Sequence, residues 1–365
     1  MEFFCPKCGR REPLSTRLSH CPCGALWELD YTPPKFDLSM IDRSEWSQFR
    51  YRAFMALDDG ESWRSVSLGE GMTPVVRLND GVLAKADYMM PTLSFKDRGA
   101  AVLVAHCKAI GVDRVVQDSS GNAGNSVAAY AAKAGIACGI FVPEGTSPKK
   151  IDMIRAHGAQ CTVVPGSRDH CADVCRAKVE EEGCYYANHV YNPLFYEGTK
   201  TYVYEVFEQL GRIPENMVIP VGNGTLYLGA VKALEHLLES GCIDHFPQIW
   251  ALQSERCDPL YQAAVRGEDL PAAVSPVPTL AEGISIGKPM RGEKILALAK
   301  KHGIRFVDVP EDGILAARAE LARQGFYVEH TTAANYAALD EIRRQYGPID
   351  DILITLCGAG LKSDH

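Results

Sequence analysis

The sequence predicts an α/β fold of two three-layer, parallel-sheet domains, preceded by a small cysteine-containing segment. Short apolar runs alternate with amphipathic stretches of helical spacing from residue 82 to residue 355, and this alternation is typical of parallel strands joined by crossover helices. The chain has 365 residues, of which 46% are hydrophobic, enough to form two hydrophobic cores. Glycine-containing loops follow several of the predicted strands.

The apolar runs and the helical periodicity place the elements in two series. In the first series, strands are expected at 82–86, 113–117, 138–142, 160–164 and 184–187. The helices between them are expected at 97–110, 124–135, 148–157 and 168–182. In the second series, strands are expected at 216–220, 248–253, 305–309 and 350–355. Its helices are expected at 195–210, 226–240, 256–267, 291–302, 312–324 and 332–346.

Charge and hydropathy exclude several classes of partner. The net charge is −8 and basic runs are absent, which argues against nucleic acid and anionic membranes. No apolar stretch approaches the roughly 20 residues that span a bilayer. The sequence opens Met1-Glu2-Phe3-Phe4 without a basic leader, so we expect a cytoplasmic protein with reduced thiols rather than disulfides.

Four of the 13 cysteines lie close together in the first 30 residues. Cys5 and Cys8 form one pair and Cys21 and Cys23 the other, with Gly and Pro residues suited to tight turns. Two thiolate pairs at this spacing can meet at a tetrahedral, structural zinc ion, although the second pair has one intervening residue instead of two. The sequence therefore predicts a zinc-ribbon-like segment over 1–30; the alternative is four ordinary reduced cysteines.

The segment after the cysteines, residues 31–65, is predicted to be a connector. Apolar residues recur at helical spacing over 41–57, which predicts a helix there. The following Leu68–Pro74 stretch is rich in glycine and ends in proline, which predicts a loop.

Lys96 is the candidate for covalent chemistry. It lies between Phe95 and the Asp97-Arg98 pair, at the start of a predicted helix. The positive end of the helix dipole and partial desolvation beside an aromatic ring both favour a neutral amine. Such an amine can form a Schiff base with an aldehyde; the alternative is an exposed lysine at a helix start.

Two further loops join a strand to a helix and have features of anion sites. One contains Ser119, Ser120, Gly121 and Asn122, and the other Gly222, Asn223, Gly224 and Thr225. Amides at a helix N-terminus bind anions, and small residues let a ligand approach. The alternatives are a serine-capped turn for the first and a plain turn for the second.

Together with Cys357, which ends the last predicted strand before Gly358-Ala359-Gly360, these segments resemble the pyridoxal-phosphate enzymes of fold type II, the tryptophan synthase beta superfamily. The resemblance covers about residues 65–362, and within the class it is strongest to threonine synthase. A second resemblance is to the serine and threonine dehydratases. The resemblance to fold type II enzymes implies three parts of the chain. These are a segment of 1–30, a large pyridoxal-phosphate-binding domain of 31–103 plus 191–365, and a small domain of 104–190. It also implies a homodimer.

The resemblance also implies the roles of individual residues. Lys96 is the Schiff-base and catalytic residue, and Asn122 hydrogen-bonds the cofactor ring hydroxyl. Ser119, Ser120, Gly121 and Asn122 bind the substrate carboxylate. The cofactor phosphate is bound by the loop Gly222, Asn223, Gly224, Thr225. Cys357 faces the pyridine nitrogen, and a weakly polar group there suits elimination more than transamination; the alternative is an ordinary buried strand cysteine.

The implied activity is that of a lyase in amino-acid metabolism, acting on a small amino acid by Schiff-base formation, α-proton abstraction and β- or γ-elimination. Threonine synthase converts O-phosphohomoserine to threonine and phosphate. Phe195 stands where that family has a phosphate-binding arginine, and Ala359 where it has a histidine; a phenyl ring cannot replace a bidentate guanidinium. A β-eliminase of the dehydratase type, a β-replacement enzyme acting on a non-phosphorylated amino acid, and a ligand-sensing regulator remain alternatives.

Overall fold

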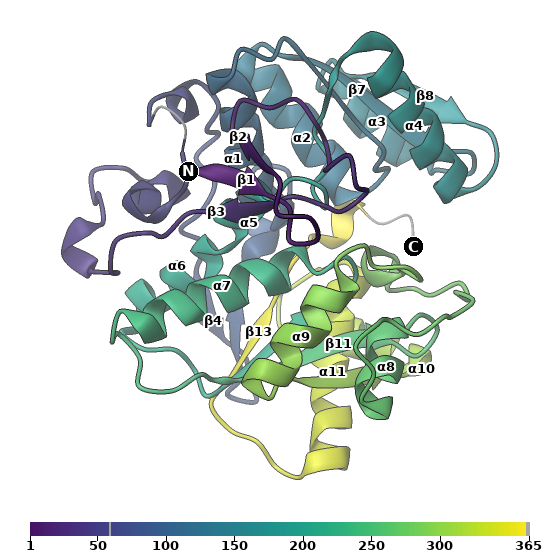
Figure 1. The fold of residues 1–365 in the computed structure, drawn as a ribbon. Coiled ribbons are helices and arrows are strands. Elements are labelled where there is room, and N and C mark those ends of the chain that lie inside the picture. Colours follow the sequence, from purple (N-terminus) through teal and green to yellow (C-terminus); the bar gives the residue numbers. More distant parts are fainter. Residues whose placement is uncertain (58–59, 363–365) are drawn as a thin grey trace. The chain divides into compact units, whose positions relative to one another are not determined.

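The computed structural model describes residues 1–57 and 60–362, and these form two compact units (Figure 1). Unit one contains residues 1–72 and 96–199, and unit two contains residues 73–95 and 200–362. The predicted boundaries at 30, 103 and 190 differ from this grouping and stay a prediction. The predicted large domain also includes residues 58–59 and 363–365, which lie outside the described residues.

Unit one begins with a three-stranded antiparallel sheet of order β2-β1-β3. Its strands are β1 (Glu2–Phe4), β2 (Arg11–Pro13) and β3 (Glu28–Asp30). The turns that follow the two cysteine pairs use Gly9 and Gly24, whose φ angles of 75° and 89° favour glycine. Trp27 is buried beneath this sheet, and its indole nitrogen donates to the carbonyl of Leu18 at 2.9 Å. Trp27 packs in one cluster with Phe3 and Leu14 but also with Ala56 and Leu194, so the small segment shares its hydrophobic core with the rest of unit one.

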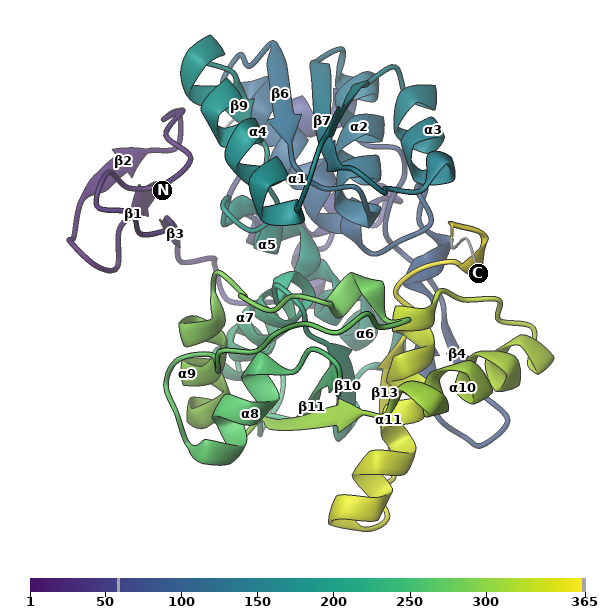
Figure 2. The same cartoon turned by 90° about the vertical axis from the view of Figure 1, so that its right-hand side faces the viewer.

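A four-stranded parallel sheet of order β8-β7-β6-β9 forms the rest of unit one. The strands are β6 (Arg114–Gln117), β7 (Ala137–Pro143), β8 (Gln160–Val164) and β9 (Tyr185–Tyr186). The helices are α1 (Lys96–Ala109), α2 (Asn122–Ala134), α3 (Pro148–Ala156), α4 (Arg168–Glu182) and α5 (Leu194–Thr199). Successive side chains of β7 point to opposite faces: Ile140 and Val142 pack in a cluster with Ile154 of α3, whereas Phe141 packs with Cys171 and Cys175 of α4. The sheet is thus covered by helices on both faces, as Figure 2 shows.

Unit two contains a six-stranded sheet of order β12-β11-β10-β13-β5-β4, parallel except for the edge strand β4. The strands are β4 (Val75–Arg77), β5 (Leu83–Lys85), β10 (Asn216–Pro220), β11 (Gln248–Ser254), β12 (Arg305–Val309) and β13 (Ile352–Thr355). The helices are α6 (Thr201–Leu210), α7 (Thr225–Glu239), α8 (Pro259–Arg266), α9 (Gly292–His302), α10 (Glu311–Arg323) and α11 (His330–Tyr346). Helices α10 and α11 pack together, and α9 packs with α7 and α8, so the sheet is again the middle of three layers (Figure 1).

The predicted α/β fold is confirmed, with local differences. The helix expected over 41–57 is wrong: the structure has 3₁₀ helices at Leu38–Met40 and Gln48–Phe54 instead. The helix expected over 195–210 is divided into α5 and α6. The sequence also did not predict the three-residue strands β1 to β4, which are too short to show a periodicity.

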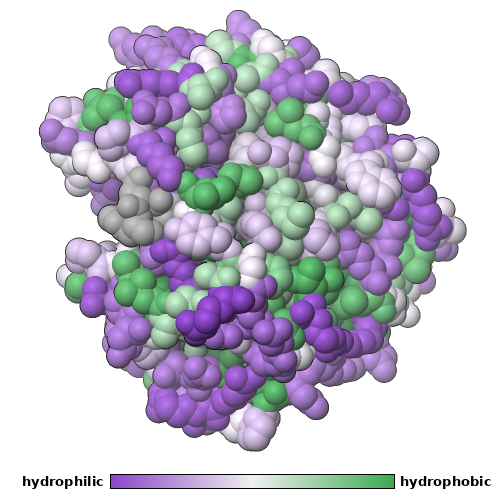
Figure 3. Space-filling view, turned by 180° about the vertical axis from the view of Figure 1, so that it is seen from behind, coloured by the Kyte–Doolittle hydropathy of each residue, from purple (hydrophilic) through white to green (hydrophobic). Residues whose placement is uncertain are grey.

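Among the described residues, no helix is long and apolar enough to cross a membrane. On the face shown in Figure 3, hydrophobic residues form separate groups among hydrophilic ones.

Candidate active site and cysteine cluster

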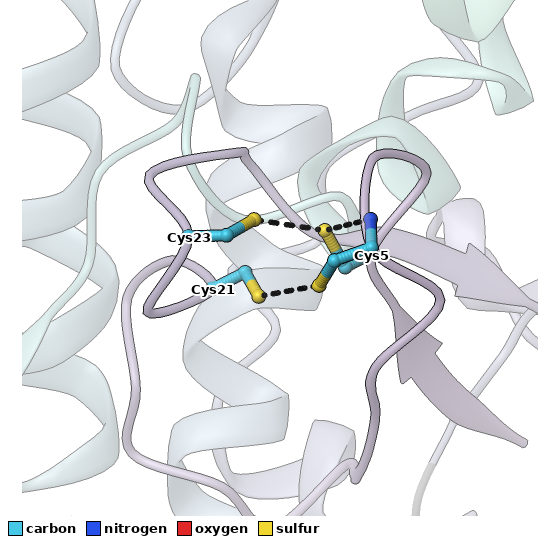
Figure 4. A group of neighbouring side chains, drawn as sticks. Cys5, Cys21 and Cys23 are labelled. Atoms are coloured by element: carbon cyan, nitrogen blue, oxygen red, sulfur yellow. Dashed lines mark hydrogen bonds between the residues drawn. The ribbon is translucent and has the colours of Figure 1, made fainter.

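The four N-terminal cysteines gather at one point of unit one (Figure 4). Their sulfur atoms all lie within 4.8 Å of one another, with 3.4 Å between Cys5 and Cys23 and 3.5 Å between Cys8 and Cys21. A tetrahedral zinc ion with Zn–S bonds of about 2.3 Å separates its sulfurs by roughly 3.8 Å. The arrangement therefore fits a closed tetrathiolate site.

The backbone around Cys5 favours its thiolate. Burial raises the pKa of the Cys5 thiol, but hydrogen bonds from the amides of Cys8 and Lys7 and from the Cys23 thiol outweigh it, and the pKa falls to about 6. The amide nitrogen of Cys8 is 3.4 Å from the Cys5 sulfur. In the opposite direction, burial and hydrogen bonds to the neighbouring thiols raise the pKa of the Cys21 thiol to about 12, so the support for metal binding comes from the geometry of the cluster.

Lys96 is the first residue of α1, as the sequence predicted within one residue. Its side chain is half-buried, whereas those of Asp97 and Arg98 are fully buried. The Asp97 carboxylate accepts a hydrogen bond from the Ser126 hydroxyl of α2. This bond joins the start of α1 to the helix that follows the serine-containing loop, so both predicted features lie in the same part of unit one.

The loop of Ser119, Ser120, Gly121 and Asn122 connects β6 to α2. Gly121 is the N-cap of α2, so no side chain there can bond the first amides of the helix. A Cβ added to Gly121 would meet no described atom within 4 Å, whereas one on Gly124 would lie 1.8 Å from the Ser119 carbonyl oxygen. The loop is thus packed closely on its inner side and open at Gly121, as an anion site requires.

In unit two, Gly222, Asn223, Gly224 and Thr225 connect β10 to α7. Gly224 is the N-cap of α7 with a φ of 77°. Its added Cβ would lie 2.4 Å from the Ile295 side chain, and one on Gly222 would lie 3.0 Å from a backbone atom of Ile284. Only glycine fits this cradle of helix N-terminal amides, which suits a phosphate group.

Cys357 follows β13, the strand beside β10. Because Val218 pairs with Ile354, Cys357 and Val221 stand at equivalent positions three residues further on. The phosphate-type loop and Cys357 are therefore neighbours at the carboxyl edge of one parallel sheet. The chain leading into Lys96 also bonds here, since the Phe95 amide donates to the Cys357 carbonyl at 2.9 Å.

Two residues around Cys357 were missed by the sequence reasoning. The Thr332 hydroxyl lies 3.1 Å from the Cys357 sulfur, and the Glu329 carboxylate lies 3.9 Å from it. A Cβ on Gly358 would lie only 2.2 Å from the Glu329 carboxyl carbon. Both residues come from the start of α11, and no local motif marks them.

Phe195, at the position where the resemblance places an arginine, is fully buried on α5. Its ring occupies the space beside Gly99, where an added Cβ would lie 2.2 Å from it, and meets the ring of His189 edge-on at 5.8 Å.

His189 is a further polar residue that the sequence reasoning missed. It is buried, and burial lowers the pKa of its imidazole well below the ordinary value; the charges of Lys96 and Arg168 act in the same direction. Its Nδ1 atom is buried and has no hydrogen-bond partner among the described residues.

Comparisons with known proteins agree with the resemblance. A family model described as pyridoxal-phosphate dependent enzyme matches residues 66–358. The threonine synthase of Methanocaldococcus jannaschii is 32% identical over 377 aligned residues, which cover 98% of this chain and 92% of that protein. The threonine synthase of Mycobacterium leprae is 33% identical over 289 residues, covering 77% and 78% of the two chains.

Solved structures share the fold. The processed form of threonine deaminase isoform 2 from Solanum lycopersicum matches with a TM-score of 0.71 at 22% identity, covering 81% of this chain and 85% of that one. Maize serine racemase matches with a TM-score of 0.69 at 20% identity, covering 79% and 88%.

Proposed function

Because the chain belongs to the family of pyridoxal-phosphate dependent enzymes, we propose that it is a lyase of the threonine synthase type. Its substrate would be a small amino acid that loses a group from its β- or γ-carbon. The observation that supports this most is the identity of 32% to a threonine synthase over 98% of the chain. The glycine cradle before α7 adds a feature that fits the cofactor's phosphate.

The residues that would hold pyridoxal phosphate are those that the resemblance implies. Lys96 would hold it covalently through the ε-nitrogen, and Asn122 would hydrogen-bond its ring hydroxyl. Gly222, Asn223, Gly224 and Thr225 would bind its phosphate, and Cys357 would face its ring nitrogen. When bound, the cofactor supplies an electron sink for negative charge at the substrate's α-carbon.

The chain's own residues would bind the substrate and move its protons. The loop of Ser119, Ser120, Gly121 and Asn122 would bind the carboxylate through the amides that begin α2. After the substrate amine has taken the place of Lys96 on the cofactor, the freed ε-amine of Lys96 would take the substrate's α-proton. It would then return a proton to a carbon further along the substrate. The hydrogen bond between Ser126 and Asp97 holds the start of α1, from which Lys96 projects, against α2.

A second candidate is a β-eliminase of the serine/threonine dehydratase type, or a β-replacement enzyme acting on a non-phosphorylated amino acid. One observation favours it: Phe195 is fully buried against Gly99 and offers no charge for a phosphorylated substrate. Both candidates share the cofactor chemistry and differ in the group that leaves.

The test is to incubate the purified protein with pyridoxal phosphate and record its visible absorbance, then reduce it with borohydride and map the modified peptide. We expect modification at Lys96; a protein that stays colourless and unmodified would overturn the proposal. Phosphate release from O-phosphohomoserine would identify the threonine synthase activity. Formation of a 2-oxo acid from serine or threonine would identify the dehydratase activity.

We further propose that Cys5, Cys8, Cys21 and Cys23 bind one structural zinc ion, because four thiols within 4.8 Å leave no open coordination position. Elemental analysis of protein purified under reducing conditions tests this, and protein that contains no zinc and takes up none would refute it. The resemblance also supports a homodimer in the cytoplasm, which light scattering and cell fractionation can test.

A further inference from the structure

His189 lies at the same edge of the sheet as the serine-containing loop. Strands β6 and β9 are parallel neighbours, with Val116 paired to Tyr186 (Figure 2). Ser119 and His189 each follow this pair by three residues, so both lie just beyond the carboxyl ends of neighbouring strands. In open parallel sheets the carboxyl ends of the strands form the ligand-binding edge.

The segment that carries His189 is tied to the segment that carries Ser119. The Asn188 amide group donates to the Asp118 carboxylate at 2.8 Å, and the Tyr186 hydroxyl donates to the same carboxylate oxygen at 2.6 Å. Asp118 directly precedes Ser119, and Asn188 directly precedes His189. These bonds fix the two segments relative to each other, as a preorganised binding site requires.

The imidazole of His189 has a buried nitrogen that can form a hydrogen bond with an uncharged ligand group. Its Nδ1 is buried without a partner among the described residues, and such a group costs free energy unless a ligand satisfies it. The lowered pKa keeps the ring neutral at physiological pH, so the ring is a hydrogen-bonding group and not an acid. The ring of Phe195, which meets the imidazole edge-on at 5.8 Å, is apolar.

We propose that His189 is a substrate-binding residue whose Nδ1 hydrogen-bonds an uncharged oxygen on the side chain of the amino-acid substrate, such as a hydroxyl on the γ-carbon. The proposal rests on the function proposed above, in which the carboxylate binds at the loop after β6. Adjacent strands are about 4.8 Å apart, which matches the reach from a carboxylate to a γ-substituent. His189 would therefore select substrates by their side chain while the neighbouring loop binds the part common to all amino acids.

The test compares two amino acids that differ by one hydroxyl, L-homoserine and L-2-aminobutyrate, by calorimetric titration of the full chain loaded with pyridoxal phosphate. We expect His189→Phe, which keeps an aromatic ring against Phe195, to weaken homoserine binding about fivefold to thirtyfold, the effect of one or two kcal/mol of hydrogen bonding. Aminobutyrate binding should change less than about twofold. His189→Asn, which keeps a hydrogen-bonding group, should retain most of the homoserine affinity.

His106→Phe is the matched control, because His106 is another buried histidine of unit one, near the opposite end of α1 from Lys96. It should leave both affinities unchanged. Equal homoserine affinity in the wild type and His189→Phe, or an equal loss for both amino acids, would overturn the assignment of His189. A wild-type chain without cofactor absorbance would instead overturn the proposed function and this proposal with it.

Discussion

Glu70 makes the stability of unit one depend on pH in an unusual direction. Its carboxylate is fully buried and accepts hydrogen bonds from the Leu68 amide at 2.8 Å and the Tyr130 hydroxyl at 3.0 Å. Burial nevertheless dominates, and the nearby negative charge of Asp97 adds to it, so the pKa of the Glu70 carboxyl rises to about 7 from an ordinary 4.5. The protonated form is therefore the one that the folded chain prefers.

The direction in which stability changes with pH follows from proton linkage. Between pH 4.5 and about 7 the folded chain keeps a proton on Glu70 that the unfolded chain releases. The free energy of unfolding therefore falls as pH rises through this interval. Above the interval, the stabilising contribution of the Glu70 proton is completely lost. Since each pKa unit is worth about 1.36 kcal/mol, the total loss is roughly 3 kcal/mol.

Glu70→Gln should remove this loss, because the amide is neutral at every pH. Its oxygen can accept from Leu68 and Tyr130, and its NH₂ can donate to the Ser67 hydroxyl, which lies 3.1 Å from the other carboxylate oxygen. We expect the variant to match the wild type at pH 5 and to exceed it by up to about 3 kcal/mol at pH 8. Urea unfolding at both pH values measures the difference.

Glu61→Gln is the control, because it also removes one carboxylate but at an exposed position. It should leave the difference between pH 5 and pH 8 unchanged. A Glu70→Gln variant whose unfolding free energy relative to the wild type is the same at both pH values would refute the reasoning.

Three further predictions concern the cofactor loop, the cysteine cluster and the core of unit two. Gly224→Ala should weaken pyridoxal phosphate binding about tenfold or more, measured by absorbance titration, because φ is 77° and the added Cβ would lie 2.4 Å from a neighbouring isoleucine. Cys21→Ser should reduce bound zinc from about one ion per chain to nearly none in elemental analysis, whereas Cys242→Ser, outside the cluster, should not. Glu205→Gln should cost about 3–5 kcal/mol in urea unfolding, because the fully buried ammonium of Lys85, 2.8 Å away, loses its counter-charge; an equally stable variant would contradict this.

The features that the sequence predicted correctly are those set by local physics. The Met217–Pro220 run is almost wholly apolar and fully buried in β10, as a central parallel strand requires. The four clustered cysteines follow from the short spacing within each pair and from turns that need glycine. The start of α1 at Lys96 was likewise recognisable from the chain around it.

The features that could not be predicted depend on contacts between distant segments. The apolar spacing over 41–57 suggested an α-helix, but Gln48 bonds the Glu70 carbonyl through its amide and the Arg98 carbonyl through its side chain. These tertiary bonds accompany a 3₁₀ helix there in place of the longer α-helix. Thr332 and Glu329 meet Cys357 only because α11 begins beside the end of β13.

Local sequence identifies a cofactor site more readily than a site for the substrate side chain. Phosphate and carboxylate loops depend on glycine and on the first amides of one helix, so a few adjacent residues identify them. The group that we propose to contact a substrate side chain, His189, follows the neighbouring strand, and its place near Ser119 depends on the pairing of Val116 with Tyr186. The cofactor family is therefore readable from motifs in this chain, whereas the role proposed for His189 could be inferred only from the pairing of β6 with β9.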